Sequence, residues 1–180
     1  MKAKYIVSLF RILFIKVKLG KKLYLKSPFQ FFGKNIDLSV SGNSLIELDY
    51  KNYFSKNATI GAHDGGKITI GKNNFFNNGL NIESLLSIEI GNDNLFGPNV
   101  SIFDHSHSYT EAHGLKINET GYRKKRIFIG SDVWIATGCV ICEGVVIEDH
   151  VVVGANSVVT GNLESGYFYA GAPAKKIKGI

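Results

Sequence analysis

The sequence has few cysteines and prolines, which excludes several architectures at once. Of its 180 residues only two are cysteine, Cys139 and Cys142, and they form a single CxxC stretch. No second cysteine pair is present to complete a zinc site, and so few cysteines fit a reducing compartment. Only three prolines occur, so the chain is not a low-complexity linker protein. Its length fits one domain, and its 20 glycines fit a tightly turned all-β protein.

Long apolar runs are also missing near the N-terminus. Residues 2–18 read KAKYIVSLFRILFIKVK, and Arg11 ends the longest uncharged run, Tyr5 to Phe10. A signal peptide needs an apolar run of about 7–15 residues and a transmembrane span about 20, so neither fits. We expect residues 2–18 to be either a short helix or strand that packs on the base of the fold, or a basic amphipathic anchor on an anionic inner membrane leaflet.

The net charge is positive, but it does not identify the binding partner. The formal net charge is +6, from 21 basic and 15 acidic side chains. Clustered lysines attract anionic partners such as phosphates, a nucleotide or a membrane face. No recognised nucleic-acid-binding motif accompanies the charge, so we expect no nucleic acid partner.

What the sequence does contain is a strict six-residue repeat between residues 129 and 163. A large aliphatic residue returns every six positions, at Ile129, Ile135, Ile141, Ile147, Val153 and Val159. Six is a multiple of the two-residue strand period, so positions i and i+4 of each hexad can face one interior. We therefore predict a solenoid whose coils stack about 4.8 Å apart, with like residues 18 positions apart lying over one another. Cys139 falls on a small inward position of its hexad, so the CxxC is predicted to be structural.

The first part of the chain follows this pattern less strictly. Residues 19–53 alternate irregularly, and we interpret them as the first, imperfect coils, since terminal repeats are often atypical. Regular hexads begin near Ile60, but eight residues separate Ile82 from Ile90, and the extra two are expected to bulge at a corner. Between Ile102 and Ile129 an insertion, residues 103–128, holds three of the five histidines. Insertions in a solenoid leave on one face and often carry binding or chemistry.

Four blocks, in this order, resemble the hexapeptide-repeat acyltransferases. They are the hexads, GPNVSIFDHSHSY at residues 97–109, the IGSDVWIATG block, and the ending GANSVVTGN…YAGAPAKKI. The resemblance is closest to the branch that holds galactoside, maltose and polysaccharide O-acetyltransferases, and it covers residues 58–180. It implies an all-β, left-handed parallel β-helix with an extended loop insertion and a basic C-terminal tail. Residues 1–57 would be the N-terminal segment and first coils, and residues 58–180 the acyltransferase domain.

The histidines of the insertion are the candidate catalytic residues. Acyl transfer from a thioester to a hydroxyl needs a base, and an imidazole is matched to that task near neutral pH. His105 and His107 compete for the role, and the resemblance places the family's catalytic histidine on His107. Asp104 could orient an imidazole, or it could cap the turn. His63, His113 and His150 are not expected to take part.

No serine or cysteine lies beside a base at a known motif spacing. We therefore expect direct attack by the acceptor in a ternary complex, without a covalent acyl-enzyme.

The resemblance also implies where acetyl-CoA and the acceptor bind. Coenzyme A would lie in a groove parallel to the coil axis, between neighbouring subunits, against Thr137, Ala155 and Thr160. Lys175 and Lys178 match positions that are usually arginine and hold phosphates; lysine keeps the charge but loses the bidentate fork.

Two further residues have an alternative structural interpretation. By resemblance, Trp134 walls the acceptor and pantetheine region and Asn77 contacts the acceptor. Trp134 could equally be an exposed spacer or a subunit contact, and Asn77 could be one of many corner asparagines.

The leading functional hypothesis is an acetyl-CoA-dependent O-acetyltransferase that modifies a sugar hydroxyl during assembly of a surface polysaccharide, capsule or O-antigen. It would be a cytoplasmic homotrimer with no bound metal. Peripheral contact with the inner membrane would follow if residues 2–18 form the amphipathic anchor. One alternative keeps the chemistry and changes the acceptor to an antibiotic or to the amine of a nucleotide sugar. A zinc-dependent, carbonic-anhydrase-like hexapeptide protein and a purely structural β-helix subunit are the others.

Overall fold

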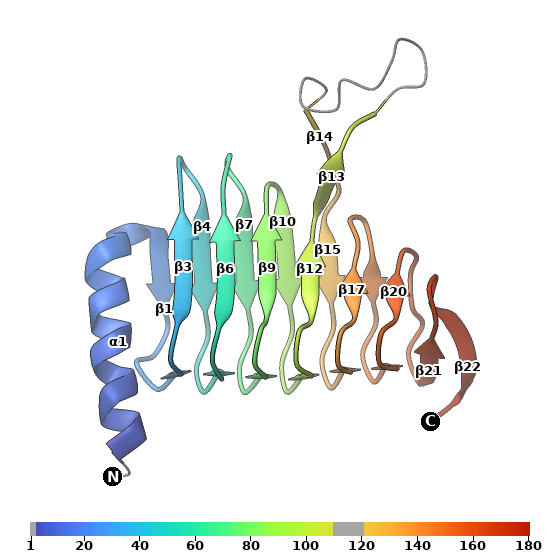
Figure 1. The fold of residues 1–180 in the computed structure, drawn as a ribbon, viewed down its shortest axis with the longest axis horizontal. Coiled ribbons are helices and arrows are strands. Elements are labelled where there is room, and N and C mark those ends of the chain that lie inside the picture. The colour runs from blue at the N-terminus through green and yellow to red at the C-terminus, as the bar shows by residue number, and fades with distance from the viewer. Residues whose placement is uncertain (1–2, 110–120) are drawn as a thin grey trace.

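The computed structural model describes residues 3–109 and 121–180 and shows a left-handed parallel β-helix of about six turns. Three sheets, parallel except for the last strand of one of them, form the sides of a triangular prism, and a helix lies across its N-terminal end (Figure 1). The predicted fold class is confirmed.

Each coil contributes one strand to each of the three sheets. Sheet A contains β1 (Leu23–Leu25), β4 (Leu45–Leu48), β7 (Lys67–Ile70), β10 (Ser87–Ile90), β15 (Ile127–Ile129) and β18 (Val146–Ile147). Sheet B contains β2 (Phe31–Phe32), β5 (Tyr53–Phe54), β8 (Phe75–Phe76), β11 (Leu95–Phe96), β16 (Trp134–Ile135), β19 (Val152–Val153), β21 (Tyr167–Ala170) and β22 (Lys175–Gly179). Sheet C contains β3 (Ile36–Val40), β6 (Ala58–Ala62), β9 (Asn81–Ser84), β12 (Ser101–Phe103), β17 (Val140–Ile141) and β20 (Val158–Val159).

The stacking predicted from the hexads is confirmed residue by residue. Ile129 pairs with Ile147, Ile135 with Val153, and Ile141 with Val159. Each of these side chains is fully buried.

The CxxC cysteines are free thiols in the coil wall. Cys139 is buried, as its inward position predicted, and its thiol donates to the Gly154 carbonyl at 3.1 Å. Burial raises the pKa of both the Cys139 and the Cys142 thiol. Both are therefore protonated near neutral pH, and neither is poised as a nucleophile.

The interior beneath sheet B is an aromatic stack in the first coils. Phe54 lies 4.8 Å from Phe76 and Phe76 lies 4.6 Å from Phe96, measured between ring centroids, and the rings are nearly parallel. Ile135 continues the same column in the next coil. Because these side chains are fully buried, the column supplies a large share of the apolar area that stabilises the coils.

From the second coil onward, extra residues enter the coils at one corner. From sheet B to sheet C the inward residues stay six positions apart, as in Phe76 to Ile82. From sheet C back to sheet A the spacing varies: it is ten from Ile60 to Ile70, eight from Ile82 to Ile90, and 27 from Ile102 to Ile129. We call this corner the C–A edge, and the corner between sheets B and C the B–C corner.

The N-terminal segment is a helix, α1 (Ala3–Leu19), followed by a short 3₁₀ turn, η1 (Gly20–Lys22). Its Ser8, Ile12 and Ile15 are buried against the first coil, and the backbone N–H of Phe32 donates to the Ser8 hydroxyl at 2.7 Å. A hydrogen bond from the Arg11 guanidinium to the Phe32 carbonyl, 3.2 Å long, adds to this contact. The helix therefore packs on the base of the prism and satisfies part of an otherwise unpaired strand edge.

Candidate active site

The insertion begins as an antiparallel hairpin that leaves the C–A edge, opposite sheet B (Figure 1). Its strands are β13 (His105–His107) and β14 (Tyr122–Lys124), and His107 lies opposite Tyr122 in the register. His113 falls outside the described residues.

Asp104, just before the hairpin, is fully buried and makes contacts that fit each of its two alternative roles. Its carboxylate accepts hydrogen bonds from the Ser84 hydroxyl at 2.7 Å and from the backbone N–H groups of Leu85 and Leu86 at 2.8 and 2.9 Å. One carboxylate oxygen also lies 3.1 Å from Nδ1 of His105. Asp104 thus caps the widened corner before β10 and contacts one candidate imidazole.

The two candidate histidines have different surroundings. The His105 side chain is only 18% exposed and contacts the edge of the Tyr122 ring, 5.3 Å between centroids. His107 is exposed at the surface of the hairpin, and its ring lies 4.6 Å from that of Tyr122. His105 is held against the coil, whereas His107 presents its imidazole to solvent.

The hairpin is tied to the prism through Glu143. The Glu143 carboxylate accepts hydrogen bonds from the Ser106 hydroxyl at 3.1 Å and from Nε of Arg123 at 2.8 Å. Burial acts to raise the pKa of the Glu143 carboxyl, but these hydrogen bonds outweigh burial and the net pKa lies below its usual value. A charged Glu143 therefore holds both strands of the hairpin, of which β13 carries His105 and His107.

Sequence reasoning missed Tyr122 and the polar groups that continue along the C–A edge. His63 lies 3.6 Å from the Glu83 carboxylate and within hydrogen-bond reach of the Ser39 and Ser41 hydroxyls. Burial raises the pKa of the Glu83 carboxyl, and the His63 and His105 imidazoles offset only part of that effect. No signal in the six-residue period marks these residues, because they lie where the period breaks.

The residues matched to coenzyme A and acceptor contacts gather mainly at the B–C corner. Backbone hydrogen bonds join successive coils there, from Gly138 to the Pro98 carbonyl and from Asn156 to the Thr137 carbonyl, each 2.8 Å long. Asn77, Thr137 and Ala155 all lie in this column, since they follow β8, β16 and β19 directly or by one residue.

Close backbone approach at this corner requires small residues. A Cβ on Gly97 would lie 2.6 Å from the backbone nitrogen of Thr137. Thr137 and Ala155 are exposed, so a thin ligand can approach their backbone. The Asn77 side chain is partly engaged, because its amide oxygen accepts a 2.8 Å hydrogen bond from the Asn78 N–H.

Of the remaining predicted residues, Trp134 lies next to this corner, and the others lie at the end of sheet B or at the C–A edge. Trp134 is 49% exposed on β16 and leads into the B–C corner. Lys175 and Lys178 are exposed on β22, which pairs antiparallel with β21 at the end of sheet B. Thr160 follows β20 and lies at the C–A end of sheet C.

Within one chain the histidines of the hairpin and the residues of the B–C corner lie apart. The B–C corner precedes each strand of sheet C, whereas the hairpin follows β12, so His107 and Thr137 lie at opposite ends of that sheet.

Comparison with known proteins identifies the family to which the chain is related. A family model described as bacterial transferase hexapeptide (six repeats) matches residues 126–161. A putative lipopolysaccharide biosynthesis O-acetyl transferase of Escherichia coli K12 is 32% identical over 137 residues, covering 69% of this chain and 70% of that protein. The galactoside O-acetyltransferase of the same strain is 36% identical over 116 residues, 64% of this chain; the match spans only 56% of that relative's length.

A solved structure shares the fold across most of the chain. The galactoside acetyltransferase in complex with coenzyme A is 25% identical, with a TM-score of 0.57, and covers 94% of this chain and 70% of that one. Together with the hexads, the continuous coil and the hairpin at its edge, these likenesses lead to one conclusion: the chain belongs to the family of hexapeptide-repeat acetyltransferases.

Proposed function

We propose that this protein is an acetyl-CoA-dependent O-acetyltransferase that transfers an acetyl group to a saccharide hydroxyl during assembly of a surface polysaccharide, capsule or lipopolysaccharide. The names of its relatives support both the reaction and this setting. The observation that carries the proposal is an exposed imidazole, His107, held on a hairpin anchored by Glu143 at the edge of the coil.

His107 acts as the general base in this proposal. Its imidazole takes the proton of the acceptor hydroxyl as the hydroxyl oxygen attacks the thioester carbonyl carbon. The carbon–sulfur bond then breaks, the acetyl group stays on the oxygen, and the proton passes from the imidazolium to the departing coenzyme A sulfur. His105 and Asp104 support the geometry of the hairpin base through their 3.1 Å contact. The raised pKa of both thiols agrees with direct attack rather than an acyl-cysteine.

Coenzyme A occupies the B–C corner, with its pantetheine arm along Thr137 and Ala155 and its phosphates near Lys175 and Lys178. The small, exposed corner residues support this placement, and so does the position of β22 at the end of the same face. Trp134, Asn77 and Thr160 take the contacts that the family resemblance gives them.

The active form is a homotrimer with three shared sites. His107 and Thr137 lie at opposite ends of sheet C in one chain, so the hairpin of one copy has to face the B–C corner of another. A symmetric closed ring of three prisms supplies such a contact three times.

We place the reaction in the cytoplasm, with peripheral membrane contact through the N-terminal helix. The two cysteines are free thiols, which fits a reducing compartment. No helix in the described part of the chain is long and apolar enough to cross a bilayer.

The test is acetyl transfer from radiolabelled acetyl-CoA to a panel of saccharides, amino sugars and antibiotics. We expect label on a saccharide hydroxyl, and we expect His107→Ala to lower kcat by about 10²–10⁴-fold with little change in coenzyme A affinity. His150→Asn is the matched control, because His150 is exposed at a corner and asparagine tolerates its φ of 57°.

Label on amines alone would replace the proposal by the nucleotide-sugar or antibiotic alternative. Activity of His107→Ala within a few-fold of wild type would remove His107 as the base, and the same loss in His105→Ala alone would transfer the role. The zinc alternative predicts bound metal, which metal analysis of the purified protein would detect.

A further inference from the structure

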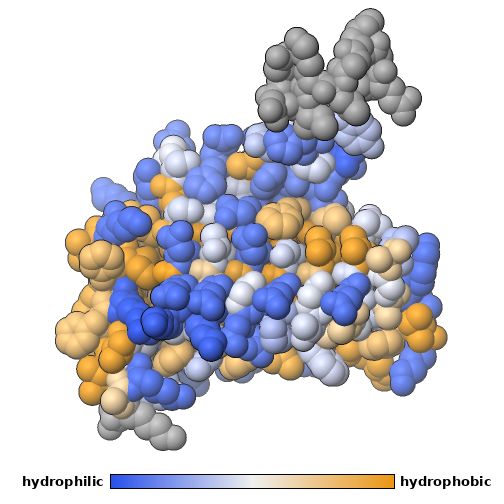
Figure 2. Space-filling view, in the orientation of Figure 1, coloured by the Kyte–Doolittle hydropathy of each residue, from blue (hydrophilic) through white to orange (hydrophobic). Residues whose placement is uncertain are grey.

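Helix α1 is apolar on two opposite faces, and only one of them is covered. The inward face carries the buried Ile12 and Ile15. The outward face carries Phe10, Phe14 and Val17, which are 68%, 72% and 83% exposed and recur at helical spacing on one side. Figure 2 shows apolar side chains gathered over this end of the molecule. The other large apolar residues of the helix that remain exposed are Tyr5, Ile6, Val7, Leu9 and Leu13.

Exposed basic residues lie beside the outward face and just after the helix. At 100° per residue, Lys18 and Arg11 lie on one side of the Phe10–Phe14–Val17 stripe. Arg11 and Lys16 are half-buried and donate to backbone carbonyls on the coil side, whereas Lys18, and Lys21 and Lys22 of η1, are exposed. The first 36 residues contain nine of the 21 basic side chains and none of the 15 acidic ones. The rest of the chain is therefore net negative, and the whole excess of positive charge belongs to the end that α1 covers.

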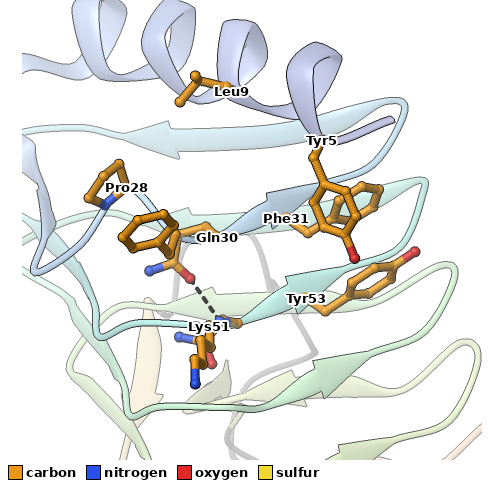
Figure 3. A pocket seen from close by; sticks show the side chains of 9 residues that line it. Tyr5, Leu9, Pro28, Gln30, Phe31, Lys51 and Tyr53 are labelled. Atoms are coloured by element: carbon orange, nitrogen blue, oxygen red, sulfur yellow. Dashed lines mark hydrogen bonds between the residues drawn. The ribbon is translucent and has the colours of Figure 1, made fainter. Parts of the chain in front are cut away.

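An apolar pocket extends this surface onto the first coil. It has a volume of about 510 Å³ and lies between one flank of α1 and the coil (Figure 3). Tyr5 and Leu9 of the helix line it, as do Phe31 and Tyr53 of sheet B. Phe29 at the pocket is 77% exposed. The amine of Lys4 lies within 5.2 to 5.9 Å of the Tyr5, Phe31 and Tyr53 ring centroids, so a cation sits beside the apolar wall.

We propose that the outward face of α1 binds flat on an anionic lipid surface. An interfacial helix buries its apolar face at the boundary between headgroups and acyl chains, while flanking lysines and arginines reach the anionic headgroups. The 17 residues of α1 are too few to span a bilayer. A second copy of the chain is a poorer occupant, because pairing two such faces would bring two strongly basic, acid-free segments together.

This docking sets the orientation of the prism. Because α1 lies across the N-terminal end of the coil in Figure 1, a helix lying in the membrane plane stands the prism on that end. The hairpin with His107 then projects sideways, above the membrane surface. Such an orientation suits a saccharide acceptor carried on a membrane lipid; that step rests on the proposed acetyl transfer, whereas lipid binding does not.

The experiment is flotation of the full chain with phosphatidylcholine vesicles, with and without phosphatidylglycerol. We expect binding to the anionic vesicles only, and release as salt rises from about 0.1 M to about 1 M, where the screening length falls to about 3 Å. Phe10→Ser/Phe14→Ser should weaken binding by at least about tenfold, because both rings lose contact with the acyl boundary. Lys18→Gln/Lys21→Gln/Lys22→Gln should weaken it by about 100-fold.

Ile177→Ser/Ile180→Ser is the matched control, because these residues are 57% and 63% exposed at the opposite end of the prism. It should float as wild type does. The proposal is overturned if the wild type stays unbound, if it binds neutral vesicles equally, or if the phenylalanine variant floats unchanged. It is also overturned if that variant lowers the molar mass in light scattering without vesicles, since a second copy then covers the face. Circular dichroism checks that each variant remains folded.

Discussion

The B–C corner and the C–A edge of the same prism differ in how constant the number of residues between inward positions is. At the B–C corner the inward residues are always six positions apart, from Phe54 and Ile60 onward, whereas at the C–A edge the spacing changes from coil to coil. Contact between coils differs at the tips of the turns: at the B–C corner a Cβ on Gly97 would collide with the backbone at Thr137, whereas Gly42 and Gly65 at the C–A edge have no atom within 4 Å of such a Cβ. Only at the base of that edge is the approach close, since a Cβ on Gly66 would collide with the Ser84 carbonyl oxygen. One corner is fixed by packing and the other can take up extra chain.

This difference explains where the candidate chemistry lies. Closing a longer loop costs little additional free energy, roughly 0.6 kcal/mol for each doubling of its length. The C–A edge can therefore hold a long insertion while β12 and β15 remain in their sheets on either side. The B–C corner keeps a constant shape, which suits the small, exposed residues proposed to receive coenzyme A.

The largest effect should come from adding one residue at each corner. A glycine inserted between Gly138 and Cys139 shifts the inward positions of the following strand, so buried side chains turn outward. We expect this variant to lose several kcal/mol and to be unfolded or aggregated on expression. A glycine inserted between Gly42 and Asn43, both exposed at the C–A edge, should change the free energy of unfolding by less than about 1 kcal/mol.

Thermal and urea unfolding of the two variants measure the contrast. Similar losses of stability in both would show that the corners do not differ in the way described.

A smaller effect should follow from Asp104→Asn. The amide is nearly the same size but cannot accept all the hydrogen bonds that the carboxylate receives from Ser84, Leu85 and Leu86. We expect the free energy of unfolding to fall by about 1–3 kcal/mol. The control is Asp93→Asn, an exposed corner position with φ of 60°, which should cost less than about 0.5 kcal/mol.

Turnover separates the two roles of Asp104. We measure kcat and KM of Asp104→Asn at a temperature well below its midpoint of thermal unfolding. A lower kcat with an unchanged KM indicates that the carboxylate also positions His105. Equal stability losses at positions 104 and 93 would contradict the capping role.

The sequence was sufficient for the regular coils and insufficient for the site around the hairpin. Spacing alone predicted that Ile135 lies over Val153, because a stacked coil repeats its contacts every 18 residues. The early coils look irregular because extra residues enter at the C–A edge and one enters between Leu25 and Phe32; counted from Phe54 to Ile60 they keep the same six-residue step.

Contacts made outside the repeat left no comparable signal. Tyr122 meets His107 through an antiparallel pairing that spans the insertion, and Glu83 meets His63 across neighbouring coils. The sequence of residues 2–18 fits both a segment packed on the base of the coil and a membrane anchor. The structure shows that a helix apolar on both faces can pack on the coil with one face and leave the other exposed.

The most direct test of the central claim is a crystal structure of the protein with bound coenzyme A. The account predicts a trimer in which the pantetheine arm lies along Thr137 and Ala155 of one copy, with its sulfur close to His107 of a neighbouring copy. Coenzyme A bound away from the B–C corner, or a sulfur out of reach of every His107, would contradict it.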